Sequence, residues 1–140
     1  MSSSRSDQLH ECPCTGQTLA KLVHPAILTI LAGGPLHGYR IVEYVAKTPV
    51  LDGNRPNPTG VYRVLRALEQ GGYVVSAWDL SDRGPARRSY RLTPAGRQCL
   101  DRWIETLDRY RRAIGKLLST ARQASAAGKK GSRSRSKGKQ

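Results

Sequence analysis

Acidic residues are scarce in this sequence, which has 10 Asp and Glu against 24 Lys and Arg. The formal net charge at pH 7 is +14, and a field of this sign attracts polyanions without specifying any fold. Six of the positive charges lie in the last twelve residues, so residues 1–128 still carry a formal +8. We therefore expect the body of the chain, as well as its terminus, to meet an anionic partner.

Long apolar runs and a disulfide framework are also missing. The apolar stretch at residues 26–32 is far shorter than the roughly 20 residues that cross a membrane. The N-terminal residues MSSSRSDQLHECPCTG lack the apolar core of a signal peptide. Three cysteines, an odd number, argue against a secreted protein that is held by disulfides. The expected location is cytoplasmic and DNA-associated, with no membrane partner.

Signatures of catalysis are absent as well. The sequence shows no Gly-rich phosphate loop, no Ser-His-Asp set and no carboxylate pair on a suitable scaffold. Its ten acidic residues are spread thinly along the chain. These absences predict that the protein is not an enzyme.

What the sequence does have is a regular succession of helix signals. Apolar residues recur at helical spacing from Leu19 to Leu31, and Pro25 stands either in the first turn of this helix or between two shorter helices. A second helix is expected from about Leu36 to Ala46. Asn57-Pro58 begins a third helix, with Asn as the cap and Pro in the first turn, and Gly71-Gly72 ends it.

Two strand-like segments follow, at residues 73–80 and 87–92, and turn-forming residues join them into a hairpin. Thr93-Pro94 repeats the cap-then-proline signal and begins a long helix that is expected to end near Thr120. Apolar residues on this helix alternate at spacings of three and four, which is typical of a helix that packs lengthwise against others. This seam consists of Leu100, Trp103, Leu107, Tyr110, Ile114 and Leu117.

This order of elements predicts a mainly α (α+β) fold, a winged helix-turn-helix with a two-stranded wing and a long C-terminal dimerisation helix. The expected parts are a flexible arm at 1–18, a DNA-binding domain at 19–93, the dimerisation helix at 94–121 and a disordered basic tail at 122–140. In such a module the third helix enters the major groove and the wing reaches the flanking backbone. Double-stranded DNA and a second copy of the chain are thus the expected partners. A charge-driven protein that coats nucleic acid is the alternative.

Polar residues of the third helix and the wing are the candidate DNA contacts. Arg63 or Arg66 is suited to a guanine edge, Thr59 and Tyr62 to phosphates, and Gly60 to close backbone approach. The alternative is a core helix beside arginines that only meet solvent. The predicted contact set is Thr59, Gly60, Tyr62, Arg63, Arg66, Arg83, Arg87, Arg88 and Arg91.

Four further residues are expected to have structural roles. His37 and Tyr39 are assigned to helix-start and core-packing roles, and a functional role is the alternative. Gly38 is assigned to a close approach between helices, and Trp78 to packing at the base of the wing.

Several segments together resemble the PadR-like transcriptional regulators. They are Leu36-His37-Gly38-Tyr39, residues 60–69 (GVYRVLRALE), Gly71, Gly84-Pro85, Tyr90-Arg91-Leu92-Thr93 and Ala95-Gly96. The resemblance runs from about Leu22 to Leu118, and the single C-terminal helix is similar to the shorter subgroup. It implies a winged-helix homodimer and a ligand- or stress-responsive repressor of an operator with dyad symmetry. It also implies that Tyr62 and the wing arginines touch DNA.

Trp103 is the candidate effector residue. Some relatives use aromatic residues of this helix to sandwich flat, apolar effectors, which suggests a small aromatic ligand. The alternative is a tryptophan buried in the dimer interface without any ligand.

The N-terminal arm has an unusual Cys12-Pro13-Cys14 segment with His10 nearby. Thiolates and imidazole bind soft or borderline metals, and Cys99 of the long helix is a further candidate ligand. This pattern suggests a metal- or redox-sensing regulator, and the alternative is a disordered arm with free thiols. No other cofactor is expected.

Overall fold

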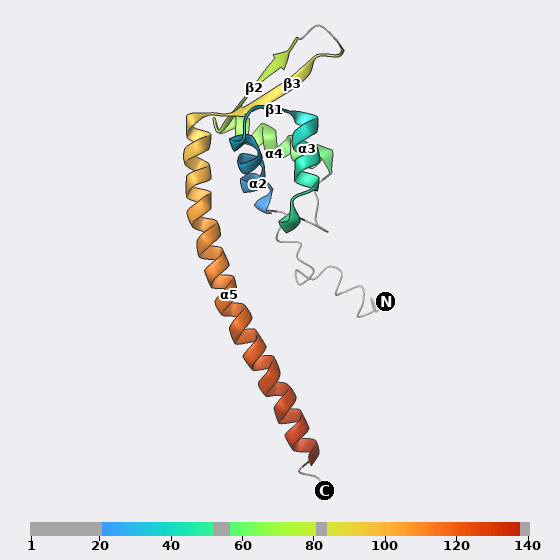
Figure 1. The fold of residues 1–140 in the computed structure, drawn as a ribbon, viewed down its shortest axis with the longest axis vertical. Coiled ribbons are helices and arrows are strands. Elements are labelled where there is room, and N and C mark those ends of the chain that lie inside the picture. The colour runs from blue at the N-terminus through green and yellow to red at the C-terminus, as the bar shows by residue number, and fades with distance from the viewer. Residues whose placement is uncertain (1–20, 52–56, 81–83, 138–140) are drawn as a thin grey trace, which may run out of the picture. The chain divides into compact units, whose positions relative to one another are not determined.

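The computed structural model describes residues 21–51, 57–80 and 84–137. The chain forms two compact units, residues 1–101 and residues 102–140. Among its described residues, the first unit holds the helices α2, α3 and α4 and a small sheet, and the long C-terminal helix begins in it (Figure 1). The elements in chain order are α2 (Val23–Ala32), β1 (Leu36–His37), α3 (Gly38–Ala46), the 3-10 turn η3 (Pro49–Leu51), α4 (Pro58–Gln70), β2 (Val74–Asp79), β3 (Arg87–Leu92) and α5 (Pro94–Lys137).

Apolar side chains of α2, α3 and α4 form the core of the first unit. Val61, Leu65 and Leu68 are buried, as the helical spacing predicts for α4. Removal of this apolar surface from water is the main favourable contribution to folding. The side chains that are least exposed to solvent are Ile27, Leu28, Leu31, Ile41, Val45, Leu51, Val61, Leu65 and Val74.

The start of α2 decides between the two interpretations of Pro25. The helix begins at Val23, so Pro25 lies in its first turn, where a missing N–H leaves no intrahelical bond unmade. The hydroxyl of Thr29 donates to the Pro25 carbonyl oxygen at 2.7 Å. The interpretation that places Pro25 in the first turn is therefore confirmed for α2, while residues 21 and 22 form a 3-10 turn before it and residues 19 and 20 lie outside the described residues.

The predicted two-stranded wing is confirmed as β2 and β3, and a third strand that was not predicted, β1, joins them in a sheet of order β1-β3-β2. β1 occupies the first two residues of the predicted second helix and pairs antiparallel with β3, with Leu36 opposite Tyr90 and His37 opposite Ser89. The chain reaches α3 in an extended conformation, since His37 has φ −69° and ψ 150°. Helix α3 therefore begins at Gly38. The wing, formed by β2 and β3, pairs in register from Val74–Leu92 to Asp79–Arg87.

The junction between the wing and α5 is fastened by Thr93. Its backbone N–H donates to the Tyr73 carbonyl oxygen at 3.1 Å, and its hydroxyl donates to the Gly72 carbonyl oxygen at 2.6 Å. The same hydroxyl oxygen accepts from the Gly96 N–H at 3.0 Å, which caps the first turn of α5. The predicted helix start at Thr93-Pro94 is thus confirmed.

The long helix α5 continues well past its predicted end near Thr120. It reaches Lys137, so the expectation of disorder over residues 122–140 is wrong as far as Lys137, and residues 138–140 lie outside the described part. Alanines at 121, 124, 126 and 127 have the strongest helix propensity. Gly128 and Gly131 each cost about 1 kcal/mol relative to Ala, but a glycine does not terminate a helix as proline does.

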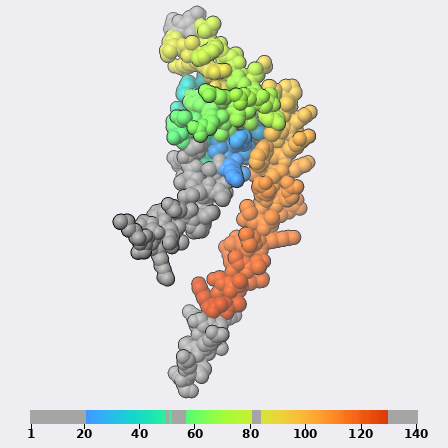
Figure 2. Space-filling view, turned by 180° about the vertical axis from the view of Figure 1, so that it is seen from behind, coloured from blue at the N-terminus to red at the C-terminus, as the bar shows by residue number. Residues whose placement is uncertain are grey.

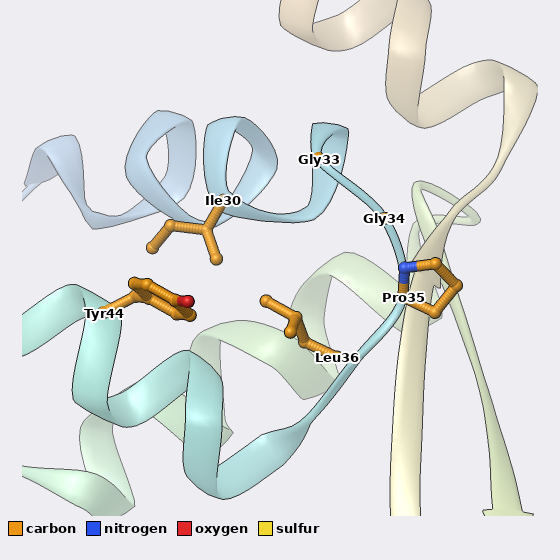
Figure 3. A pocket seen from close by; sticks show the side chains of 6 residues that line it. All are labelled: Ile30, Gly33, Gly34, Pro35, Leu36 and Tyr44. Carbon is orange, nitrogen blue, oxygen red and sulfur yellow. The ribbon is translucent and has the colours of Figure 1, made fainter.

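A small apolar hollow of about 240 Å³ lies between α2 and α3. In Figure 3 the side chains of Ile30, Leu36 and Tyr44 point toward one another, and the Gly33-Gly34-Pro35 turn closes one end. Within the described ranges, none of the helices has the length and apolar character of a membrane span.

Candidate nucleic-acid interface

Helix α4 begins with the cap that its sequence predicts. The Asn57 side-chain oxygen accepts from the Gly60 N–H at 2.7 Å, and Pro58 occupies the first turn. With the apolar side of the helix in the core, Thr59, Tyr62, Arg63 and Arg66 are exposed on its other side, and Gly60 is half-buried. The predicted division of α4 into a core face and a polar face is confirmed.

The first turn of α3 packs directly against Tyr62 of α4. A Cβ atom at Gly38 would lie 2.6 Å from Cε1 of the Tyr62 ring, which is closer than atoms can approach. The interpretation of Gly38 as a point of close helix approach is therefore confirmed.

His37 and Tyr39 do not pack in the core. His37 is the N-cap residue of α3, but its Nε2 lies 3.2 Å from Oδ2 of Asp79 on the wing. Its ring stacks on Tyr39 with centroids 5.9 Å apart, and Tyr39 is 44% exposed. The core-packing assignment is wrong because β1 turns this segment outward along the edge of β3.

Arg87 of the wing reaches over to Tyr39. Its Nη1 donates to the Tyr39 hydroxyl oxygen at 3.2 Å, and its guanidinium carbon lies 5.2 Å from the ring centroid, within the range of a cation–π contact. These residues border a groove of about 210 Å³, here called the Tyr39 groove, to which α3, α4 and the wing all contribute. Its lining residues are His37, Gly38, Tyr39, Tyr62, Ala86, Arg87 and Arg88.

Arg88 points to a second hollow between α4 and the wing. Its Nε donates to the Ser76 hydroxyl oxygen at 2.8 Å, and its Nη2 lies 3.5 Å from Oε2 of Glu69. Its guanidinium carbon also lies 5.7 Å from the Trp78 ring centroid and 6.0 Å from that of Tyr90. The α4–wing cleft measures about 380 Å³ and is lined by Tyr62, Arg66, Glu69, Trp78, Arg88 and Tyr90.

Trp78 is 61% exposed, so its assignment to packing at the wing base is wrong. The base of the wing is filled by Val74, the buried residue of β2. Trp78 lies four residues further along that strand, opposite Arg88, beyond the reach of the helical core. It forms a wall of the α4–wing cleft instead.

Tyr90 lies at the floor of this cleft and is buried. Burial raises the pKa of its hydroxyl above the ordinary value of 10.0, and the nearby Arg88 guanidinium opposes this effect. Tyr90 is therefore neutral at physiological pH, and Arg66, Arg88 and Glu69 supply the charges of the cleft. In Figure 2 the side chains of α4 and of the wing form one continuous surface.

Most of the predicted DNA contacts reach solvent on this part of the molecule. Tyr62 borders both hollows, Arg66 borders the cleft and Arg88 borders both. Arg91 is exposed but lines neither of them, and Arg83 lies outside the described residues. Sequence reasoning missed Tyr39, Glu69 and Trp78, because each acts through an arginine that is distant in the sequence.

The other predicted sites have a different outcome. Leu100, Trp103 and Leu107 of the seam are half-buried, whereas Tyr110, Ile114 and Leu117 are 47%, 60% and 69% exposed. Cys99 is a half-buried free thiol, and His10, Cys12 and Cys14 lie outside the described residues. Among the residues that the structure describes, His, Cys, Asp and Glu form no cluster that could hold a metal. The metal or redox centre therefore stays a prediction.

The chain matches the model of the "Transcriptional regulator PadR-like family" over residues 27–102, which is more than half of its length. The transcriptional regulator Rv3488 of Mycobacterium tuberculosis is 34% identical over 88 residues, covering 63% of this chain and 78% of that protein. A 37.1 kDa protein in the transposon TN4556 of Streptomyces fradiae is 36% identical over 83 residues. That match covers 59% of this chain but 22% of the transposon protein, so this chain spans less than a quarter of that relative.

Solved structures agree with this match. A transcriptional regulator from Clostridium thermocellum superimposes with a TM-score of 0.60 and 27% identity, covering 71% of this chain and 92% of that one. PadR of Bacillus subtilis in complex with operator DNA gives a TM-score of 0.52 and 26% identity, covering 59% and 46%. The predicted winged-helix fold is confirmed, and the family match identifies a transcriptional regulator, not an enzyme.

Proposed function

This chain belongs to the PadR-like family of transcriptional regulators, and from this premise we propose that it is a ligand- or stress-responsive repressor that binds a palindromic operator as a homodimer. The observation that carries the proposal is the convergence of α4 and the wing. The polar face of α4 and the wing arginines meet at two adjacent hollows that share Tyr62 and Arg88. A cytoplasmic, DNA-associated location is part of this proposal.

In the proposed complex α4 lies in the major groove and the wing follows the neighbouring phosphate backbone. Arg63 is exposed in the N-terminal half of α4 and is suited to a bidentate contact with a guanine edge. Thr59, Tyr62 and Arg66 from α4 and Arg87 and Arg88 from the wing contact phosphates, which position the protein without reading sequence. The solved complex of Bacillus subtilis PadR with operator DNA supports this arrangement by its fold.

The proposal of a homodimer is based on the apolar seam of α5. Large apolar side chains on this helix remain open to solvent in the single chain, with Ile114 at 60% and Leu117 at 69% exposure. Exposed apolar surface of this kind is typical of a protein–protein contact. A two-fold pair of wings then predicts half-sites about one or two helical turns apart.

The proposed function is tested by selecting bound sequences from a random duplex library at raised salt. A palindromic consensus supports an operator-binding repressor, whereas retention of unrelated sequences would indicate a charge-driven coating protein. Occurrence of that consensus upstream of the protein's own gene, with promoter activity falling when the protein is added, supports repression.

Arg63→Ala tests base reading by α4. If Arg63 contacts a guanine edge, its loss should weaken operator binding by about 1–3 kcal/mol and relax the preference at one position of each half-site. Binding is measured by fluorescence anisotropy on the operator and on a random duplex of equal length. An equal loss on both duplexes would reassign Arg63 to a phosphate.

Ligand response is tested at Trp103, the proposed effector residue. The chain has two tryptophans, so Trp78→Phe leaves Trp103 as the single reporter. Titration with 1-naphthol should change its emission saturably and lower the affinity of the operator. Emission that does not change would argue against a planar aromatic effector at this helix.

A further inference from the structure

The contact between Arg88 and Glu69 joins the wing to the C-terminal half of α4. Arg88 lies on β3 and Glu69 lies one residue before the end of α4. The Nη2–Oε2 distance is 3.5 Å, and the two side chains are 45% and 30% exposed. Charge-assisted hydrogen bonds are shorter, at about 2.7–2.9 Å. The Glu69 contact is thus a loose one that a better acceptor can replace.

The rest of the Arg88 side chain is held more firmly. Its Nε donates to the Ser76 hydroxyl oxygen at 2.8 Å, and the faces of Trp78 and Tyr90 lie within cation–π distance of the guanidinium. Since Ser76 takes Nε and the two rings lie 5.7 and 6.0 Å from the guanidinium carbon, the Nη donors remain for an anion. They meet Glu69 in the cleft that Arg66 also lines.

From these contacts we infer that the α4–wing cleft is a phosphodiester site, in which Arg88 and Arg66 bind one DNA phosphate and Glu69 masks Arg88 in the free protein. The inference rests on the proposed function, because it places the DNA backbone between α4 and the wing. Glu69 is a positioning residue in this scheme, since it acts through Arg88 and does not touch DNA.

Arg88 and Glu69 both keep hydrogen-bond partners when a phosphate replaces their mutual contact. When the Nη donors of Arg88 turn to a phosphate, Glu69 keeps the hydrogen bond that it accepts from the Ser76 hydroxyl. Its carboxylate is partly exposed to solvent and is not buried in the protein interior. The release of Arg88 therefore carries a small penalty, which lowers the affinity for every DNA sequence alike.

Charge gives Glu69 a second effect on the same phosphate. In α4, β2 and β3, which the structure describes completely, Glu69 and Asp79 are the acidic residues. Asp79 contacts His37 beside the Tyr39 groove. Glu69 is therefore the acidic residue that faces a phosphate in the α4–wing cleft. Its negative charge repels the DNA backbone, and this repulsion limits sequence-independent binding.

The test is a double-mutant cycle with Glu69→Gln and Arg88→Gln, on a random 30-base-pair duplex at several KCl concentrations. At 100 mM KCl, Glu69→Gln should bind about three- to tenfold more tightly than the parent chain. Arg88→Gln should weaken binding and reduce the slope of log K against log salt by about 0.9, the value for one lost phosphate. In the double variant most of the gain from Glu69→Gln should disappear, and only the part due to direct repulsion between Glu69 and the DNA backbone should remain.

Glu105→Gln is the matched control, because it makes the same change in net charge at an exposed position on α5. Its affinity should stay within twofold of the parent chain. Thermal melting of all variants checks that they are folded, and Glu69→Ala replaces Glu69→Gln if the latter melts early. The inference is overturned if Glu69→Gln behaves like Glu105→Gln, or if its full gain survives in the Arg88→Gln background. If the parent chain fails to bind any duplex, the proposed function fails as well, and this outcome is separately visible.

Discussion

Gly96 stands where the start of α5 crosses the backbone at the base of the wing. A Cβ atom at this position would lie 2.0 Å from the Tyr73 carbonyl oxygen, and neither the helix nor the strand can move away without breaking the Thr93 hydrogen bonds. Gly96→Ala should therefore destabilise the protein by about 1–3 kcal/mol, as overpacking does elsewhere. Urea denaturation followed by circular dichroism measures the change.

Gly115 provides the control for this prediction on the same helix. No atom lies within 4 Å of a Cβ at Gly115, so Gly115→Ala should be neutral or should stabilise the helix by up to about 1 kcal/mol. Equal effects of the two substitutions would show that the contact with Tyr73 does not constrain Gly96.

At the scale of single residues, local patterns predicted which side chains are buried and missed which ones meet. Val61 and Leu68 follow from helical spacing alone. The contacts of Arg87 with Tyr39 and of Arg88 with Glu69 join residues 48 and 19 positions apart. The spacing of apolar residues in the sequence does not predict such pairs, because they depend on how the wing folds back over α4.

At the scale of elements, the cap of α4 is the feature most open to test. Asn57→Ala removes the acceptor of the Gly60 N–H and should cost about 1 kcal/mol of stability. It should also weaken DNA binding, since the first turn of α4 carries the exposed Thr59. Asn57→Ser, which keeps a side-chain oxygen, should restore most of both quantities in denaturation and anisotropy measurements. Loss of stability that serine does not rescue would contradict a capping role.

The starts of helices were predictable and some of their surroundings were not. Asn57-Pro58 and Thr93-Pro94 contain their own signal, an acceptor followed by a residue that needs no N–H partner. β1 was missed because a two-residue strand has no pattern of its own and exists through pairing with β3. The end of α5 at Lys137 does not follow from composition, because the basic, glycine-containing residues are typical of disorder while the alanines before them favour a helix.

At the scale of the whole molecule, the decisive prediction concerns the assembly. Ile114→Glu puts a charge in the apolar seam of α5 and, by two-fold symmetry, brings two such charges into one interface. The proposed dimer should dissociate at least tenfold more readily, and binding to the proposed operator should weaken with it. Sedimentation velocity over a range of concentrations measures the assembly, and the melting of the first unit should stay unchanged because Ile114 is exposed in the single chain.

Ser119→Glu is the matched control, since Ser119 is exposed and falls outside the seam of α5. It adds the same charge to the same helix and should leave the assembly intact. A dimer that survives Ile114→Glu as well as Ser119→Glu would mean that the chains pair through some other surface.

The junction at Thr93 has a mechanical consequence. One residue separates the last residue of β3 from the first residue of α5, and that residue is hydrogen-bonded on both sides, to the Gly72 and Tyr73 carbonyls and to the Gly96 N–H. Thr93 is thus held firmly between β3 and α5, so a small rotation of the first helical turn cannot be absorbed at this residue. β3 is also the central strand, bonded to both neighbours. A rotation of the first turn of α5 would therefore also move β3, the strand that carries Arg87 and Arg88.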